Sequence, residues 1–167
     1  MIPFVGRGDD PRKGLDVLLR AIAEMMAAIK PLLAAVGNGN PKEAIRIAKD
    51  LGVSDCIKIL GFVDSAFLRH CYRVSDVHVS SSGLEGFGQS VAEAMLMGKN
   101  VVATRVGEVP DIVNDGENGI LVSNESHREI GNAAARIPAD EAEGEILEKQ
   151  CAEDSGFLQV VQGYTAN

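Results

Sequence analysis

The sequence has no tryptophan, and aromatic residues make up only 4% of the chain. This scarcity argues against a binding surface built from aromatic side chains. The net charge is −8, so there is no overall excess of basic residues, and non-specific binding to nucleic acid is not expected. Much of the acidic excess falls in residues 140–145. A local basic site earlier in the chain therefore stays open.

Cysteine and long apolar runs are also scarce. Cys56, Cys71 and Cys151 form no CxxC pair, so neither a disulfide framework nor a zinc site is expected, and a reducing cytoplasm is the simplest location. No apolar run approaches 18 residues, and no basic segment leads into such a run at the N-terminus. The sequence therefore predicts neither a membrane span nor an export signal.

What the chain does have is glycine, 18 residues in all, often at the ends of short apolar segments. Strand-like segments alternate with amphipathic helical ones through residue 137. We expect strands at 2–5, 31–36, 57–60, 76–80, 100–104 and 119–122, and helices at 11–29, 41–51, 65–74, 88–98, 110–114 and 126–137. This alternation predicts an α/β fold, a Rossmann-like three-layer sandwich whose parallel sheet has about six strands. Residues 138–167 are expected to be a weakly helical or poorly ordered tail.

The most informative stretch runs from residue 80 to residue 95, where a predicted strand ends in a glycine-rich turn and a helix begins near Gly88. The start of such a helix favours an anion. Glu85 lies in the turn and Glu93 on the helix, with seven residues between them. The helix dipole accounts for an acidic residue at the position of Glu85, but Glu93 has apolar neighbours and needs a partner. The helix start would bind a phosphate, and the two glutamates would bind hydroxyl-rich groups on either side of it. A phosphate between two hydroxyl-rich groups is the arrangement found in a sugar nucleotide.

Two cations follow the first predicted strand. Arg7 lies in its exit loop, and Lys13 is expected in the first turn of the next helix, which Asp10 would cap. A cation at that place opposes the helix dipole unless an anion is present. Arg7 and Lys13 together would clamp a diphosphate. The alternative, two solvated cations near Asp9 and Asp10, is equally consistent with the spacing.

Other motifs in the sequence give weaker evidence of function. Residues 37–39 form a Gly-Asn-Gly sequence with no third glycine, which indicates a plain turn and not a dinucleotide fingerprint. The histidines His70, His78 and His127 show no ligand spacing. The serines at 80–82 lack a GxSxG elbow and a partnered histidine, which argues against a hydrolase.

Together these residues resemble the C-terminal, donor-binding half of the retaining glycosyltransferases of family four, which have the GT-B fold. The resemblance covers roughly residues 2–137. Its motifs are Gly6-Arg7 with Lys13-Gly14, residues 59–63 (ILGFV), residues 75–77 (SDV), Glu85-Gly86-Phe87-Gly88 with residues 93–95 (EAM), residues 101–104 (VVAT) and residues 118–122 (NGILV).

The resemblance implies transfer of a sugar from a nucleoside-diphosphate sugar by front-side displacement with retained anomeric configuration. Catalytic roles follow for Arg7 and Lys13, at the diphosphate, and for Glu85, at the transferred sugar. Donor-binding roles follow for Gly6, Gly61, Phe62, Val63, Gly86, Phe87, Gly88 and Glu93, with Glu93 at the ribose and the loop 61–64 against the base. No metal or further cofactor is expected, because the cations neutralise the diphosphate.

In that family an N-terminal domain binds the acceptor, and we expect it to be absent from this chain, which would then be inactive by itself. A partner chain or a longer polypeptide would complete the site, and peripheral membrane contact through that other half stays open. Two alternatives stay open as well: a non-catalytic nucleotide-binding module, and one half of a nucleotide-sugar epimerase.

Overall fold

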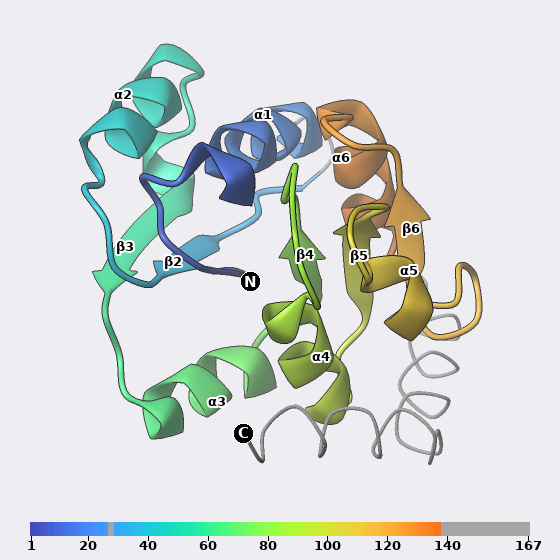
Figure 1. Ribbon diagram of the computed structural model, residues 1–167. Helices are drawn as coiled ribbons and strands as arrows, with labels where there is room; N and C mark the ends of the chain where they lie inside the picture. The colour runs from blue at the N-terminus through green and yellow to red at the C-terminus, as the bar shows by residue number, and fades with distance from the viewer. Residues whose placement is uncertain (27–28, 138–167) are drawn as a thin grey trace.

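The computed structural model describes residues 1–26 and 29–137 (Figure 1). Its strands are β1 (Ile2–Val5), β2 (Leu33–Val36), β3 (Ile57–Gly61), β4 (His78–Ser80), β5 (Val101–Thr104) and β6 (Ile120–Val122). Its α-helices are α1 (Leu15–Met25), α2 (Lys42–Asp50), α3 (Ser65–Arg73), α4 (Gln89–Leu96), α5 (Val109–Ile112) and α6 (His127–Arg136). Short 3₁₀ turns, η1 (Pro11–Lys13) and η2 (Ser54–Cys56), precede α1 and β3. The tail expected at 138–167 lies outside the described residues.

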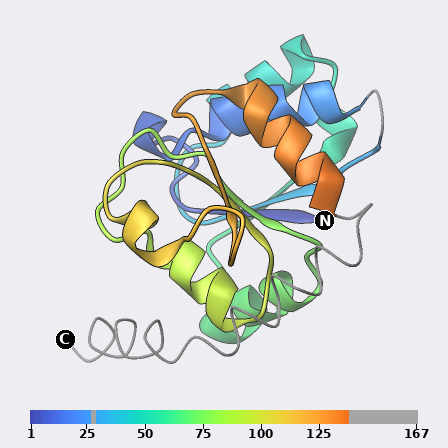
Figure 2. The same cartoon turned by 90° about the vertical axis from the view of Figure 1, so that its right-hand side faces the viewer.

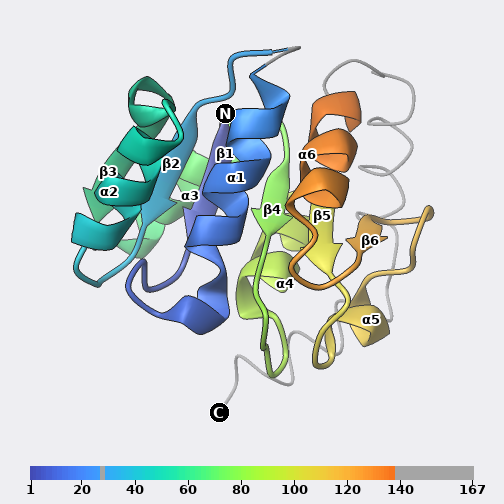
Figure 3. The same ribbon diagram turned by 90° about the horizontal axis from the view of Figure 1, so that it is seen from above.

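The strands form two parallel three-stranded sheets, β1-β2-β3 and β4-β5-β6. The sheets lie side by side with β1 next to β4, so the order across the molecule is 3-2-1-4-5-6 (Figure 3). This is the order of doubly wound nucleotide-binding folds, which bind ligands beyond the carboxyl ends of their strands. The predicted α/β class and the six strands are confirmed.

The sequence predicts one continuous sheet, but the ladder is interrupted between β1 and β4. The Ile2 N–H donates to the Leu32 carbonyl at 2.8 Å and the Gly6 N–H donates to the Val36 carbonyl at 2.9 Å, both on the side of β2. Successive residues of a strand direct their N–H groups to opposite sides, so Pro3 faces β4, and a proline has no N–H to donate. The two sheets meet through a hydrogen bond from the Asp76 N–H to the Met1 carbonyl, 3.0 Å.

Helices cover both faces of the paired sheets (Figures 1 and 2). On one face α1, α2 and α6 enclose a core that includes Leu18, Ile22 and Ile130. On the other, α3, α4 and α5 pack over a second core that includes Val91 and Met95. This is the predicted three-layer sandwich. Within the described residues, no helix is long and apolar enough to cross a membrane.

The predicted helix from residue 11 is interrupted at Gly14, which has a left-handed backbone with φ of 64°. Asp10 does act as a cap, since its side chain accepts from the Arg12 N–H, but it caps the turn η1. Helix α1 starts anew at Leu15. Lys13 therefore lies in η1, immediately before the amino end of α1, and not in the first turn of that helix.

Candidate functional site

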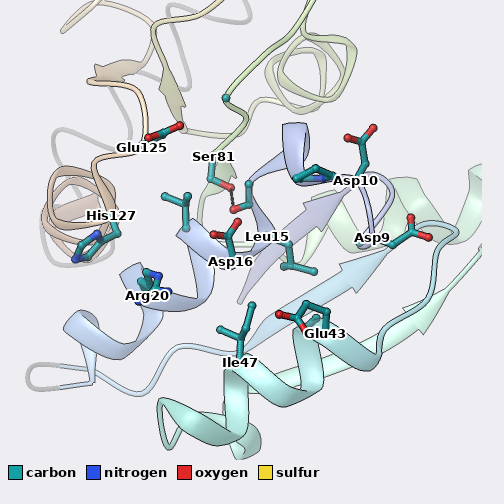
Figure 4. A pocket seen from close by; sticks show the side chains of 16 residues that line it. Asp9, Asp10, Leu15, Asp16, Arg20, Glu43, Ile47, Ser81, Glu125 and His127 are labelled. Carbon is teal, nitrogen blue, oxygen red and sulfur yellow. Dashed lines mark hydrogen bonds between the residues drawn. The ribbon is translucent and has the colours of Figure 1, made fainter.

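The site is built where the loop after β1 meets the loop after β4, along one edge of the sheet (Figure 3). The Gly83 N–H donates to the Arg12 carbonyl at 2.8 Å. The Ser81 hydroxyl donates to the Gly14 carbonyl, also at 2.8 Å (Figure 4). These bonds join two segments that are about 70 residues apart in the sequence. They fix the turn that carries Lys13 against the loop that carries Glu85.

Close backbone contact at Gly14 makes this joint specific for glycine. A Cβ atom on Gly14 would lie 2.0 Å from the Ser81 carbonyl oxygen. The left-handed φ of Gly14 also disfavours any residue with a side chain. The two loops therefore meet backbone to backbone, and the meeting leaves little freedom in the position of Lys13.

A cavity of about 490 Å³ opens beside this joint. Many of the residues predicted for the donor site line it. They are Gly6, Lys13, Glu85, Phe87, Gly88 and Glu93, together with Val5, Leu68, Gln89 and Ser90.

Lys13 and Glu85 form an ion pair at the cavity. The Lys13 ammonium lies 2.8 Å from Oε1 of Glu85, and the Ser82 hydroxyl donates to the same oxygen at 2.7 Å. The Glu85 side chain is 10% exposed and that of Lys13 is 31% exposed. Within the described part of the chain the recorded contacts of Glu85 go to Oε1, so Oε2 is the oxygen left to accept from a hydroxyl group.

Glu93 has protein partners on both oxygens. Tyr72, from α3, donates its hydroxyl to Oε2 at 3.0 Å, and Gln89 donates its side-chain amide to Oε1 at 3.2 Å. The partner that the sequence demands for Glu93 is thus supplied by two neutral side chains. Burial, and then the charge of Glu93, raise the pKa of the Tyr72 phenol, which therefore remains a donor.

The amino end of α4 completes this wall of the cavity. Gly88, with φ of 84°, ends the loop and supplies no capping side chain. A Cβ atom there would lie 2.9 Å from Cγ2 of Val109. The first N–H groups of a helix have no partner within it, and they carry the positive end of the dipole. Because Gln89 and Ser90 line the cavity, an anion bound in it would meet this end of α4.

Arg7 and Gly86 lie outside the lining. The Arg7 side chain is 67% exposed, and its Nε lies 3.2 Å from Oδ1 of Asp9, whose pKa it lowers by hydrogen bonding. This is the second of the two arrangements that the sequence left open for Arg7. Lys13, in contrast, pairs across the site. The Gly86 carbonyl accepts from the Glu108 N–H at 2.9 Å, which holds the loop after β5 against the turn.

The loop expected at the base also stands apart from the cavity lining. Phe62 is 78% exposed, the most exposed of the large apolar side chains in the described residues. Val63 borders a separate shallow hollow with Leu60 and Phe67. The Gly61 carbonyl accepts from the Gly37 N–H at 2.8 Å, which ties this loop to the end of β2.

A larger cavity of about 760 Å³ lies on the other side of the loop after β1 (Figure 4). Its carboxylates are largely paired, Asp9 with Arg7 and Asp10 with Arg12, and the guanidinium of Arg12 lowers the pKa of Asp10 to about 2. The amino end of α1 lines this larger cavity, but so do five carboxylates, and it contains neither the start of α4 nor the Lys13–Glu85 pair. The smaller cavity is therefore the better candidate for an anionic ligand.

Sequence reasoning missed Tyr72, Ser82 and Gln89. Gln89 is four residues before Glu93 on one helix, a spacing that does signal a contact. Ser82 is three residues before Glu85 in the turn, but a turn has no fixed side-chain geometry. For Tyr72 the sequence carries no signal, because α3 and α4 are brought together only by the fold.

Comparison with known proteins places this chain in a family. The sequence matches the family described as glycosyl transferases group 1 over residues 1–140. It is 37% identical over 145 residues to D-inositol 3-phosphate glycosyltransferase 2 of Catenulispora acidiphila, which covers 80% of this chain and 34% of that protein. The chain thus spans about a third of the length of the curated relatives it matches.

Comparison with solved structures supports the same family. Sucrose-phosphate synthase of Thermosynechococcus elongatus is 29% identical with a TM-score of 0.84, over 99% of this chain and 44% of that one. The C-terminal domain of a glycosyl transferase group 1 family protein of Francisella tularensis is 26% identical with a TM-score of 0.79, over 91% of this chain and 82% of that one. The expected half of a GT-B fold is confirmed, and the chain belongs to the glycosyl transferase group 1 family.

Proposed function

We propose that this chain is the donor-binding part of a retaining glycosyltransferase and holds a nucleoside-diphosphate sugar. One observation carries the proposal: a single cavity of about 490 Å³ gathers Lys13, the start of α4, and the carboxylates of Glu85 and Glu93. A cation and a helix start suit a diphosphate, and the two carboxylates suit hydroxyl groups on either side of it.

In this proposal the diphosphate lies between Lys13 and the amino end of α4. Charge that builds on the departing phosphate during transfer would be stabilised by the Lys13 ammonium and by the N–H groups at Gln89 and Ser90. Arg7 would join them by turning away from Asp9. That exposed ion pair is weak enough to be exchanged for a phosphate.

The hydroxyl-rich parts of the donor are assigned to the two glutamates. Oε2 of Glu85 would accept from the transferred sugar, while Ser82 and Lys13 hold Oε1. Glu93 would accept from the ribose. The exposed ring of Phe62, with Gly61 and Val63, would lie against the base once the donor is bound.

The acceptor is assigned to a part of the enzyme beyond this chain. Two findings support this: the chain spans about a third of its curated relatives, and it resembles a solved domain that is C-terminal in its own protein. Retention of anomeric configuration follows from the family resemblance of the motifs around Glu85 and Glu93.

Calorimetric titration of the chain with UDP, GDP and ADP and with their glucose conjugates tests the proposal. Glu85→Gln keeps the shape of the side chain but releases Lys13. We expect it to leave the affinity for the preferred bare diphosphate unchanged or higher, and to remove the additional affinity contributed by the sugar. The matched control is Glu117→Gln, an exposed glutamate outside the cavity lining. Equal loss of affinity for diphosphate and sugar nucleotide would remove Glu85 from the sugar, and no binding of any ligand by the wild type would refute the donor site.

A further inference from the structure

Glu93 is held by a phenol from another helix. Tyr72 lies in the last turn of α3, and its hydroxyl is 3.0 Å from Oε2 of Glu93 and 3.3 Å from the Ser90 carbonyl, both on α4. The nearer and charged acceptor, Glu93, is the one to which it donates. Tyr72 is 1% exposed and belongs to the core that includes Val91 and Met95. A packed aromatic ring cannot change its rotamer freely, so the hydroxyl is a fixed point from which the carboxylate is oriented.

The second contact of Glu93 is of a different kind. Gln89 is exposed, lies one turn earlier on α4, and donates at 3.2 Å. An exposed bond between neighbours on one helix contributes little and moves with that helix. Tyr72 is therefore the contact that ties Glu93 to the rest of the molecule.

Helix α3 also connects Glu93 with the loop after β3. Its cap is Asp64, at the end of that loop, whose side chain accepts from the Phe67 N–H at 2.8 Å. Most of α3 is exposed, and its buried residues are Cys71 and Tyr72. The position of the loop relative to Glu93 is thus set at the carboxyl end of α3, where Tyr72 packs against α4.

We propose that Tyr72 is the positioning residue of the nucleoside subsite. Its hydroxyl orients Glu93 toward the ribose, and its ring fixes α3 and hence the loop that lies against the base. This inference rests on the proposed function, because it takes the ligand of Glu93 to be the ribose of the donor. It predicts that Tyr72 contributes to the affinity for the nucleoside part of the ligand and not to the affinity for its diphosphate.

Tyr72→Phe tests this directly, since it removes the hydroxyl and keeps the ring. The wild-type chain and the variant are titrated with UDP, GDP and ADP, with their 2′-deoxy forms, and with inorganic pyrophosphate. For the diphosphate that the wild type binds best, we expect an affinity loss of about ten- to a hundredfold, the effect of one hydrogen bond to a charged group. Pyrophosphate affinity should stay within about twofold, and the preference for ribose over deoxyribose should narrow.

Two further variants separate positioning from folding. Cys71→Ala disturbs the packing of the same helix without touching Glu93, so we expect a lower melting temperature and an unchanged ratio of nucleotide to pyrophosphate affinity. In a Glu93→Gln background, Tyr72→Phe should cause no additional loss, because the two residues act as one unit.

The possible failures are distinguishable. An unchanged nucleotide affinity in Tyr72→Phe, an equal loss for nucleotide and pyrophosphate, or full additivity with Glu93→Gln would each overturn the role of Tyr72. If the wild-type chain bound none of the nucleotides and no pyrophosphate, the donor site itself would be refuted, and this inference with it.

Discussion

The Lys13 ammonium lies 2.8 Å from the Glu85 carboxylate, although the two residues are 72 positions apart in the sequence. Each charge neutralises the other, in a place where the side chain of Glu85 is 10% exposed. A diphosphate that enters the cavity must therefore compete with Glu85 for Lys13. The two charges of the pair cancel each other, and a ligand that carries both a phosphate and hydroxyl groups can satisfy both partners at once.

The first prediction concerns the coupling within this pair. Lys13→Met leaves the nearly buried Glu85 without its cation, and we expect unfolding in urea to become easier by about 1–2 kcal/mol, between the values for exposed and for buried pairs. Adding Glu85→Gln should recover part of that loss. The control cycle is the exposed Arg46–Glu43 pair, Arg46→Met with Glu43→Gln, where no measurable coupling is expected. Simple additivity of the Lys13 and Glu85 variants would contradict the prediction.

The fold was predictable because its signals are local. The strand at residues 2–5 matches β1 in both bounds, and the helix expected at 65–74 matches α3 to within one residue. Both follow from apolar periodicity and turn residues within a short window. The break at Gly14 was missed because it depends on contact with Ser81, a residue far away in the sequence.

The site was predictable only in part, for the same reason. The loops carrying Lys13 and Glu85 both follow strands of a parallel sheet, so their meeting follows from the topology. The topology does not determine the direction in which a long exposed side chain points. Arg7, for example, points toward Asp9. The support of Glu93 by Tyr72 depends on how α3 packs on α4, which no spacing in the sequence encodes.

A second prediction separates the two arginines of the first loop. Arg7→Ala should weaken diphosphate binding at least about tenfold through a lost charge-assisted contact. The stability of the fold should not change, since Arg7 is 67% exposed. Arg12→Ala is the matched control. Arg12 is also outside the cavity lining and is also paired with an aspartate two residues away, but its contacts with Asp10, at 2.7 to 3.2 Å, hold its guanidinium more tightly than Asp9 holds that of Arg7. Removing the Arg12 side chain should therefore leave diphosphate affinity unchanged. Unchanged affinity in Arg7→Ala, measured by titration, would exclude Arg7 from the site.

A third prediction compares two glycines with similar backbones. Gly14→Ala places a methyl group on the Ser81 carbonyl, and we expect a loss of stability of about 2–5 kcal/mol from the strained backbone and the clash together. Gly52, with φ of 71°, faces open space, so Gly52→Ala should cost only the backbone term of about 1–2 kcal/mol. Chemical denaturation measures both. Equal losses of stability in the two variants would mean that the two loops can move apart to accommodate the methyl group at residue 14, which would contradict the prediction.

The last prediction concerns the buried histidine of β4. His78 is 1% exposed, and its ring packs edge-on against Tyr72 at 5.6 Å. Burial lowers its pKa from 6.5 to about 4, and among the described residues neither ring nitrogen has a hydrogen-bond partner. Between these values the unfolded chain binds a proton that the folded chain does not. The free energy of unfolding should therefore fall as the pH drops from about 6.5 to about 4, by about 3 kcal/mol in all, and the contribution of His78 should level off below that.

His78→Leu isolates this contribution from that of the carboxylates, which titrate in part of the same range. The difference in unfolding free energy between variant and wild type should grow in favour of the variant as the pH falls from 6.5 to 4. Tyr72 does not interfere, because burial raises its pKa away from this range. His70→Gln, at an exposed position on α3, should follow the wild-type curve. Parallel curves for His78→Leu and wild type would mean that the imidazole is protonated inside the fold, in which case the environment between β1, β4 and α3 must be far more polar than the packing of His78 indicates.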